Sequence, residues 1–249
     1  MKAWFISDIH IRSMQERNGK TLLRFLLDLA QQNFDEPCRL ILLGDIFDLW
    51  VGGHNYFAKK YQPLMDALKK LKEKKFEIIY FEGNHDVHIK NYFTKKLDIE
   101  VVQEAKEIYL DHFLVRCEHG DLINTKDLAY LKYKKTLHHP WVKPLAQIVP
   151  GRLWDYIGSK ASHKSRQKST NHQIENSAEL IKMIREHAVL QYQIQPFDMI
   201  VTGHMHVLDD VVLKIGHDQT RSVNLGSWLG ESIFAFHYNG KDFEWLQVD

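Results

Sequence analysis

Hydrophobic and polar positions in the first hundred residues follow two alternating periods. Short apolar runs at residues 2–7, 39–44 and 77–83 are typical of buried strands, whereas residues 19–32 and 61–75 repeat apolar positions at helical spacing. Strands that alternate with helices usually pair in parallel through crossover connections. The pattern therefore predicts an α/β body built around a partly parallel sheet.

The second half of the chain returns to strands after a long interruption. Strand-like runs occupy residues 107–110 and 113–120 before the interruption and residues 198–204, 209–215, 221–226 and 232–238 after it. The intervening stretch has a mostly helical pattern that we expect to be broken at Pro140, Pro144 and Pro150. Without an internal repeat or a low-complexity linker, we expect a single domain over residues 1–249, with a helical cap inserted at 122–190.

Composition narrows the class of protein. With 249 residues, 44% hydrophobic and 26% charged, the chain has the make-up of an ordinary globular protein. No apolar run approaches the roughly 18–20 residues that cross a bilayer, and the N-terminal residues lack the pattern of a signal peptide. Cys38 and Cys117 both lie near strand-like runs, so we expect two buried, reduced thiols and a cytoplasmic location.

The expected cap is strongly basic although the whole chain carries a net charge of only +1. Residues 125–170 hold ten lysines and arginines against two acids, Asp127 and Asp155. Such a segment suits a pyrophosphate, an anionic membrane surface or a nucleic acid equally well. The alternative interpretation is a solvated helical face.

Polar side chains suited to metal binding follow five separate apolar runs, usually with a glycine beside them. They are Asp8 and His10, Asp45, Asn84, His119, and His204 with His206. In an open α/β sheet the groups at the carboxyl ends of strands meet in one crevice. Carboxylates, imidazoles and a neutral amide oxygen could together hold two divalent cations, which would polarise a phosphoryl group and activate water for in-line attack. Cysteine is absent from every one of these motifs, which argues against a closed structural zinc site.

The motifs D-x-H, GD, GNHD, HGD and GH-x-H, in this order, resemble those of the calcineurin-like metallophosphoesterases. The resemblance implies a β-sandwich of two mixed sheets flanked by helices, and two bound divalent ions, Mn²⁺ in the first place, with Fe²⁺, Zn²⁺ or Ni²⁺ as alternatives. It also implies that one ion is held by Asp8, His10, Asp45 and His206, and the other by Asp45, Asn84, His119 and His204. Asp45 would then bridge the two ions.

The stretch Glu82–Asp86 (EGNHD) has a chemical interpretation in this setting. Asn84 offers a neutral oxygen that binds metal without adding charge to repel phosphate. His85 would donate a proton to the leaving oxygen or stabilise its developing charge, and Asp86 would orient that imidazole.

A narrower resemblance lies in residues 43–52, residues 119–145 and the Ser/Lys/Arg-rich residues 159–170, which are similar to the UDP-2,3-diacylglucosamine pyrophosphatases of lipid A biosynthesis. It implies cleavage of a lipid-linked nucleotide sugar to UMP and 2,3-diacylglucosamine 1-phosphate, peripherally at the inner face of the inner membrane. The implied substrate contacts are Asn84, Asp127, Tyr130, Lys164, Arg166 and Lys168. Those enzymes usually have arginine after the motif asparagine, where this chain has His85 as in the wider family.

Several alternatives stay open at this stage. A phosphodiesterase or nuclease of the same family could grip nucleic acid with the basic cap, and its binding would weaken steeply with salt. A scaffold without activity is a third hypothesis, although no metal ligand is missing. Trp141, Trp154 and Tyr156 could meet a membrane or an acyl chain, or could pack as helix core. We expect His54 to be incidental, and His138 and His139 to lie on the cap surface rather than form a third metal site. The sequence does not decide the oligomeric state.

Overall fold

The computed structural model describes residues 1–139 and 141–248, without the side chains of residues 143 and 159–176. One six-stranded sheet has the order β13-β12-β1-β2-β4-β6. Strands β1 (Lys2–Ile6), β2 (Cys38–Leu42), β4 (Glu77–Phe81) and β6 (Glu100–Val102) run in parallel, while β12 (Phe234–Tyr238) and β13 (Phe243–Gln247) are antiparallel additions. The parallel part confirms the expected crossover pairing. The sequence pattern does not predict strands β6 and β13.

A second, five-stranded sheet has the order β10-β11-β9-β8-β7 and is also mixed. Its strands are β7 (Lys106–Leu110), β8 (Phe113–Cys117), β9 (Met199–Thr202), β10 (Leu208–Ile215) and β11 (Asp218–Leu225). Strand β9 is parallel to both β8 and β11, so the carboxyl ends of β8 and β9 lie together. A pair of short strands, β3 (Trp50–Val51) and β5 (Asp86–Val87), forms a third, small parallel sheet.

Residue alternation along β1 explains the layered packing. Ala3 and Phe5 face the second sheet and share a buried cluster with Val115 and Val201. Trp4 points the other way, into the cluster that the helices cover. Because successive side chains of a strand point to opposite faces, one continuous apolar strand can supply both cores.

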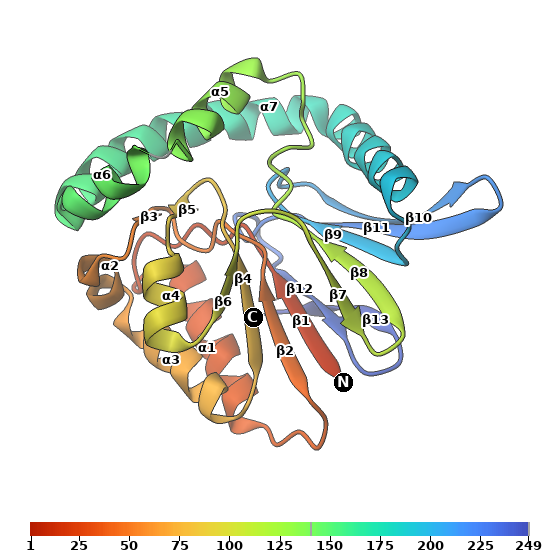
Figure 1. Ribbon diagram of the computed structural model, residues 1–249, viewed down its shortest axis with the longest axis horizontal. Helices are drawn as coiled ribbons and strands as arrows, with labels where there is room; N and C mark the ends of the chain where they lie inside the picture. The colour runs from red at the N-terminus through yellow and green to blue at the C-terminus, as the bar shows by residue number, and fades with distance from the viewer. Residues whose placement is uncertain (140, 249) are drawn as a thin grey trace.

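Helices α1 (Arg17–Gln31), α2 (Asn55–Lys60), α3 (Gln62–Glu73) and α4 (Lys90–Leu97) lie on the side of the six-stranded sheet away from the second sheet (Figure 1). Leu22, Leu26 and Leu29 are buried on α1 at the spacing of one helical face. The structure thus confirms the expected sandwich of two mixed sheets flanked by helices.

The chain between β8 and β9 is helical and crosses above the sandwich in Figure 1. It forms α5 (Leu128–Leu137), α6 (Val142–Ile148) and the long α7 (Gly151–Ile194). Pro150 is the N-cap of α7, as a helix break requires, but Pro144 lies inside the first turn of α6, where a missing N–H costs little. Pro140 lies outside the described residues. The limits of a separate cap unit at 122–190 stay a prediction.

The glycine-rich loop after β3 holds the cap against the body. Gly52 has φ +72°, and a Cβ there would lie 2.6 Å from the carbonyl oxygen of Ala146 in α6. His54 Nε2 lies 2.7 Å from the same carbonyl oxygen. The His54 ring thus contacts a main-chain group of the cap, and it belongs to none of the groups of candidate metal ligands among the described residues.

Charged groups reinforce both ends of the cap. Tyr56 and Lys60 of α2 each donate to Asp155 of α7, at 2.7 Å. Near the other end, Arg185 of α7 forms a two-pronged ion pair with Asp209 of β10. Although α7 spans 44 residues, none of the described helices is both long and apolar enough to cross a bilayer.

Candidate metal centre and active site

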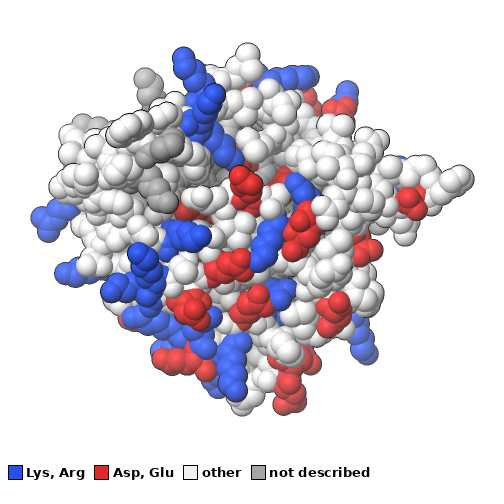
Figure 2. Space-filling view, in the orientation of Figure 1, with Lys and Arg blue, Asp and Glu red and all other residues white. Residues whose placement is uncertain are grey.

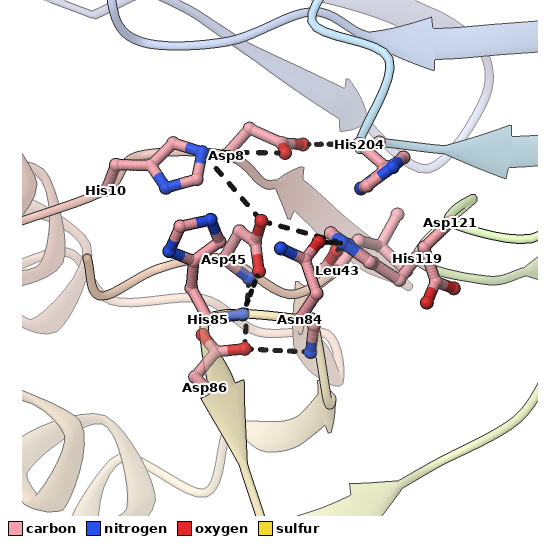
Figure 3. Close-up of polar contacts among 12 residues, drawn as sticks. Asp8, His10, Leu43, Asp45, Asn84, His85, Asp86, His119, Asp121 and His204 are labelled. Atoms are coloured by element: carbon pink, nitrogen blue, oxygen red, sulfur yellow. Dashed lines mark hydrogen bonds and ion pairs between the residues drawn. The ribbon is translucent and has the colours of Figure 1, made fainter. Parts of the chain in front are cut away.

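The side chains expected at strand ends come together at one end of the sandwich, beneath the cap (Figures 1 and 3). Asp8 and His10 follow β1, Asp45 follows β2, and Asn84 follows β4, all in the six-stranded sheet. The second sheet contributes His119 after β8, and His204 and His206 after β9. Both sheets therefore contribute, and the parallel pairs in each sheet bring carboxyl ends to the same place.

Asp45 is the centre of this arrangement. Its Oδ2 atom lies 3.8 Å from His10 Nε2 and 3.7 Å from His119 Nε2. Its Oδ1 atom accepts a hydrogen bond from the main-chain N–H of His85, at 2.9 Å. One carboxylate oxygen thus faces an imidazole on either side, which is the position a bridging ligand needs.

Three overlapping groups of candidate ligand atoms meet around Asp45. Asp8, His10 and His206 form the first group and Asp45, His119 and His204 the second, with the ligand atoms of each group within 4.8 Å of one another. His85 forms a third group with His10 and Asp45. In the first group, His206 Nε2 lies 3.1 Å from Asp8 Oδ1 and 3.1 Å from His10 Nε2.

This donor set fits two divalent cations. Two imidazole nitrogens that face each other, as those of His10 and His206 do, need a proton or a cation between them. Asn84 Oδ1 lies 3.3 Å from His119 Nε2, so the amide oxygen also points toward the second group. Oxygen and imidazole donors in this combination suit Mn²⁺, Fe²⁺, Zn²⁺ or Ni²⁺.

The buried charges shift one another's protonation. Burial would raise the pKa of Asp8, but the hydrogen bond and charge of His206, with His119 and His10, hold it well below its usual range. Burial would lower the pKa of His119, but the charges of Asp45 and Asp8 raise it to about 9. Burial, with the charge of His119, lowers the pKa of His204 to about 3. Opposite shifts in adjacent groups are typical of functional sites.

The backbone is strained at the same positions. Five of the seven candidate ligands adopt the left-handed conformation, with φ between 51° and 64°: Asp8, His10, Asp45, His204 and His206. Each such residue costs about 1–3 kcal/mol, and the surrounding structure must stabilise it. The Asp8 carboxylate contributes here, because its Oδ2 accepts the His204 N–H at 2.8 Å.

His85 lies at the edge of the first group, with its ring centroid 4.8 Å from that of His10. Its Nδ1 lies 2.8 Å from the carbonyl oxygen of Asp48. A carbonyl can only accept, so this contact places a hydrogen on Nδ1 and leaves Nε2 to carry any transferable proton.

The expectation that Asp86 orients this imidazole is wrong. The fully buried Asp86 carboxylate accepts from the N–H groups of Asp45, Ile46 and Gly83 and from the Tyr80 hydroxyl. Burial and the charge of Asp45 raise its pKa. Asp86 therefore positions the loops that carry Asp45 and Asn84, and the Asp48 main chain orients His85.

The expected substrate contacts have mixed positions. The Tyr130 ring centroid lies 5.4 Å from that of His204, so this residue of α5 reaches the centre. Asp127 instead caps α5, where its Oδ1 accepts the Tyr130 N–H at 2.8 Å. The side chains of Lys164, Arg166 and Lys168 lie outside the described residues.

Three residues near the centre were not predicted from the sequence: His88, Asp121 and Lys134. Asp121 accepts hydrogen bonds from the Tyr130 hydroxyl and from Lys134, which ties α5 to the loop after His119. Burial would raise the pKa of Asp121, but His119 and Lys134 lower it to about 2. His88 Nε2 lies 2.9 Å from the Leu137 carbonyl at the end of α5. The HGD motif contained a signal for Asp121, whereas nothing in the sequence indicated a role for His88 or Lys134.

Comparison with known proteins decides the family. The family model for calcineurin-like phosphoesterases matches residues 1–208. The chain belongs to this family. As a calcineurin-like phosphoesterase, it is a hydrolase of phosphoester or pyrophosphate bonds.

Curated relatives of this phosphoesterase include three proteins named UDP-2,3-diacylglucosamine hydrolase. The one from Photorhabdus laumondii is 28% identical over 245 residues, covering 96% of this chain and 93% of the relative. The one from Haemophilus influenzae (strain PittGG) is 26% identical and covers 82% of each chain. The one from Porphyromonas gingivalis is 26% identical and covers 94% of this chain and 93% of the relative.

Proposed function

We propose that this phosphoesterase hydrolyses the pyrophosphate of UDP-2,3-diacylglucosamine, giving UMP and 2,3-diacylglucosamine 1-phosphate in lipid A biosynthesis. The observation that carries the proposal is the donor set around Asp45, to which both sheets contribute. The names of relatives that align with most of the chain support this substrate.

Seven residues would hold two divalent cations: Asp8, His10, Asp45, Asn84, His119, His204 and His206, with Asp45 between the two ions. We propose Mn²⁺ as the native metal. The cations supply Lewis acidity to the phosphoryl group and to the attacking water.

The chain's own residues supply proton transfer and orientation. His85, with Nδ1 engaged by the Asp48 carbonyl, holds its other nitrogen ready to protonate the leaving oxygen. Tyr130 is fixed by its hydrogen bond to Asp121 and would contact the substrate beside the second group of ligands. Asp127 would act through Tyr130, since it caps the helix that carries the tyrosine. Lys164, Arg166 and Lys168 are kept as proposed contacts to phosphate or glucosamine.

Exposed apolar side chains of the cap suit a lipid substrate. Several of them lie on α6, just before it, and on the first turns of α7: Trp141, Leu145, Ile148, Leu153, Tyr156 and Ile157. Trp154 differs, since it packs against the core beside Leu49. In Figure 2 the surface over α6 and the beginning of α7, at the upper left, is largely white apart from atoms that are not described.

Aliphatic and aromatic side chains next to a basic segment are the composition of surfaces that contact anionic membranes. We therefore place the protein in the cytoplasm, in transient peripheral contact with the inner face of the inner membrane, where it would collect its substrate.

Product analysis tests the function. The Mn²⁺-loaded protein is incubated with UDP-2,3-diacylglucosamine, and UMP is quantified by chromatography. We expect UMP release that falls at least about 100-fold in His85→Ala while both metals stay bound, because a general acid contributes about 10²–10⁴-fold. The matched control is His217→Ala, an exposed histidine at the turn between β10 and β11.

Two results would contradict the proposal. Cleavage of a generic aryl phosphodiester without any release of UMP would keep the hydrolase class but exclude this substrate. Salt-sensitive cleavage of DNA or RNA would then favour the nuclease alternative. Loss of metal from His85→Ala would show that His85 is a ligand, which its closeness to His10 and Asp45 allows.

A further inference from the structure

A large cleft lies beside the metal centre, between α5, the second half of α7 and the strand ends of the body. Its volume is about 940 Å³, at the upper end of the roughly 300–1,000 Å³ typical of small-molecule sites. His119 and Asp121 line the cleft, while Asp8, His10 and His206 do not. The cleft therefore reaches the metal centre at His119, whereas Asp45, Asn84 and His204 do not line it. We call it the α5 cleft.

Three leucines from separate segments form apolar parts of the α5 cleft walls. Leu122 follows the HGD motif, Leu131 lies on α5 and Leu190 lies on α7, so three separate segments contribute leucines. Leu122 is 50% exposed and Leu190 is 58% exposed. Exposed leucines that line one cleft can make apolar contacts with a ligand without forming an enclosed hydrophobic pocket.

Part of the remaining cleft lining consists of charged groups that are paired within the protein. Glu118 contacts Arg116 at 3.3 Å and His187 of α7 at shorter range. Asp121 contacts Lys134 at 2.7 Å. An alkyl chain laid across these groups would remove their water and give nothing in return, which is costly for charged groups.

A nucleotide matches both features. A nucleobase has apolar faces for the leucines, and its polar edge can meet amides such as Gln103 and Gln191, which also line the cleft. The sugar hydroxyls can meet charged groups without stripping them of hydrogen bonds. Lys135, an exposed residue of α5 that lines the cleft, adds a cation for phosphate.

The two sides of the cap thus differ in polarity. The α5 cleft combines apolar side chains with paired charged groups, whereas the exposed side chains of α6 and early α7 are mainly apolar. In Figure 2 the middle of the molecule carries mixed blue and red side chains, in contrast to the white surface over α6. A substrate with a nucleotide at one end and acyl chains at the other would meet a matching surface on each side.

We infer that the α5 cleft is the nucleotide subsite, which holds the nucleoside 5′-phosphate half of the substrate while the acyl half lies toward α6. The inference rests on the proposed function for the identity of the nucleotide, uridine. Leu190 and Lys135 are then specificity-determining residues, one contacting the base and the other the phosphate.

Inhibition by UMP tests the subsite without the lipid substrate. The Mn²⁺-loaded full-length protein hydrolyses bis(4-nitrophenyl) phosphate, and UMP is added as a competitor. The inhibition constant is measured against each variant's own uninhibited rate, so a change in turnover does not enter it. Ribose 5-phosphate, which lacks the base, should inhibit at least about ten-fold more weakly than UMP, because it cannot use the leucine walls.

Charge variants with matched controls locate the site. We expect Lys135→Glu and Leu190→Asp each to raise the UMP inhibition constant about ten-fold, since each brings a negative charge toward the phosphate or the base. The control for Lys135→Glu is Lys132→Glu on the same helix, α5, and the control for Leu190→Asp is Ile194→Asp on α7. Both control residues are exposed and lie outside the cleft lining. The controls should leave the inhibition constant within two-fold of the original.

Three results would overturn the inference: no inhibition by UMP, equal inhibition by ribose 5-phosphate, or an unchanged inhibition constant in both cleft variants. The assay of UDP-2,3-diacylglucosamine cleavage is run separately. UMP release with an unchanged inhibition constant would preserve the proposed function and reject the subsite. The expected inhibition pattern without cleavage of the lipid substrate would do the reverse.

Discussion

Asp86→Asn should destabilise the protein without altering the chemistry of His85. The carboxylate is fully buried, and its two oxygens each accept two hydrogen bonds, between 2.5 and 3.1 Å. Asparagine keeps one oxygen and turns an N–H₂ group toward the other two donors, so two bonds are lost. Bonds to a charged group contribute about 1.5–3 kcal/mol each, and removing a buried charge that lies near Asp45 offsets part of the loss. We expect the free energy of unfolding to fall by about 2–4 kcal/mol.

Urea denaturation of the metal-free protein measures this loss, because bound metal would add its own linkage to the folded state. Tyr80→Phe is the comparison, since it removes one of the four donors and should cost about 1.5–3 kcal/mol. The pH dependence of turnover should keep its position in Asp86→Asn. A shifted pH profile with an unfolding free energy within about 0.5 kcal/mol of the original would refute the reasoning and restore Asp86 as the partner of the His85 imidazole.

Two further predictions concern the cap and the second sheet. Gly52→Ala should lower kcat/KM for the lipid substrate more than for an aryl phosphodiester, because the new methyl group meets the Ala146 carbonyl at 2.6 Å and displaces α6. The control is Gly216→Ala, where φ is +64° and no atom lies within 4 Å of the new methyl group. This control has the same backbone strain of about 1–3 kcal/mol and should change kcat/KM equally for the two substrates. Asp210 is an exposed residue of β10, and although desolvation opposes this, hydrogen bonds from Arg221 and Trp245 lower its pKa. A lowered carboxyl pKa stabilises the folded state above the ordinary value of about 4, and this stabilisation is lost as the pH falls through the lowered value. Asp210→Asn should therefore cost about 1 kcal/mol at pH 7 in urea denaturation and nothing below that lowered pKa; an equal cost at both pH values would contradict the linkage.

The clustering of the candidate metal ligands was predictable because it follows from strand order and strand direction. Parallel strands place their carboxyl ends together, so a ligand after each apolar run must lie near the others. The structure adds a distance that motif spacing in the sequence cannot give: Asp45 Oδ2 lies almost equally far from the Nε2 atoms of His10 and His119. It also shows the left-handed backbone at Asp8, Asp45 and His204.

The role of Asp86 could not be predicted in the same way. Adjacency in the chain suggested that its carboxylate would contact the His85 ring. Successive residues of an extended segment point in opposite directions, however, and β5 turns Asp86 inward toward the main-chain N–H groups of Asp45 and Ile46. The carbonyl that does contact His85 belongs to Asp48, in another strand connection.

Taken by itself, the sequence determined the main strands and helices and the set of candidate metal ligands, because periodicity and strand-end chemistry are local properties of the chain. Only the tertiary structure decided which groups meet across the cap. The contacts of His54 with Ala146, of His88 with Leu137 and of Asp121 with Lys134 join segments that are distant in the chain. The α5 cleft arises for the same reason, since its leucines come from three segments whose packing, rather than whose sequence pattern, places them around one space.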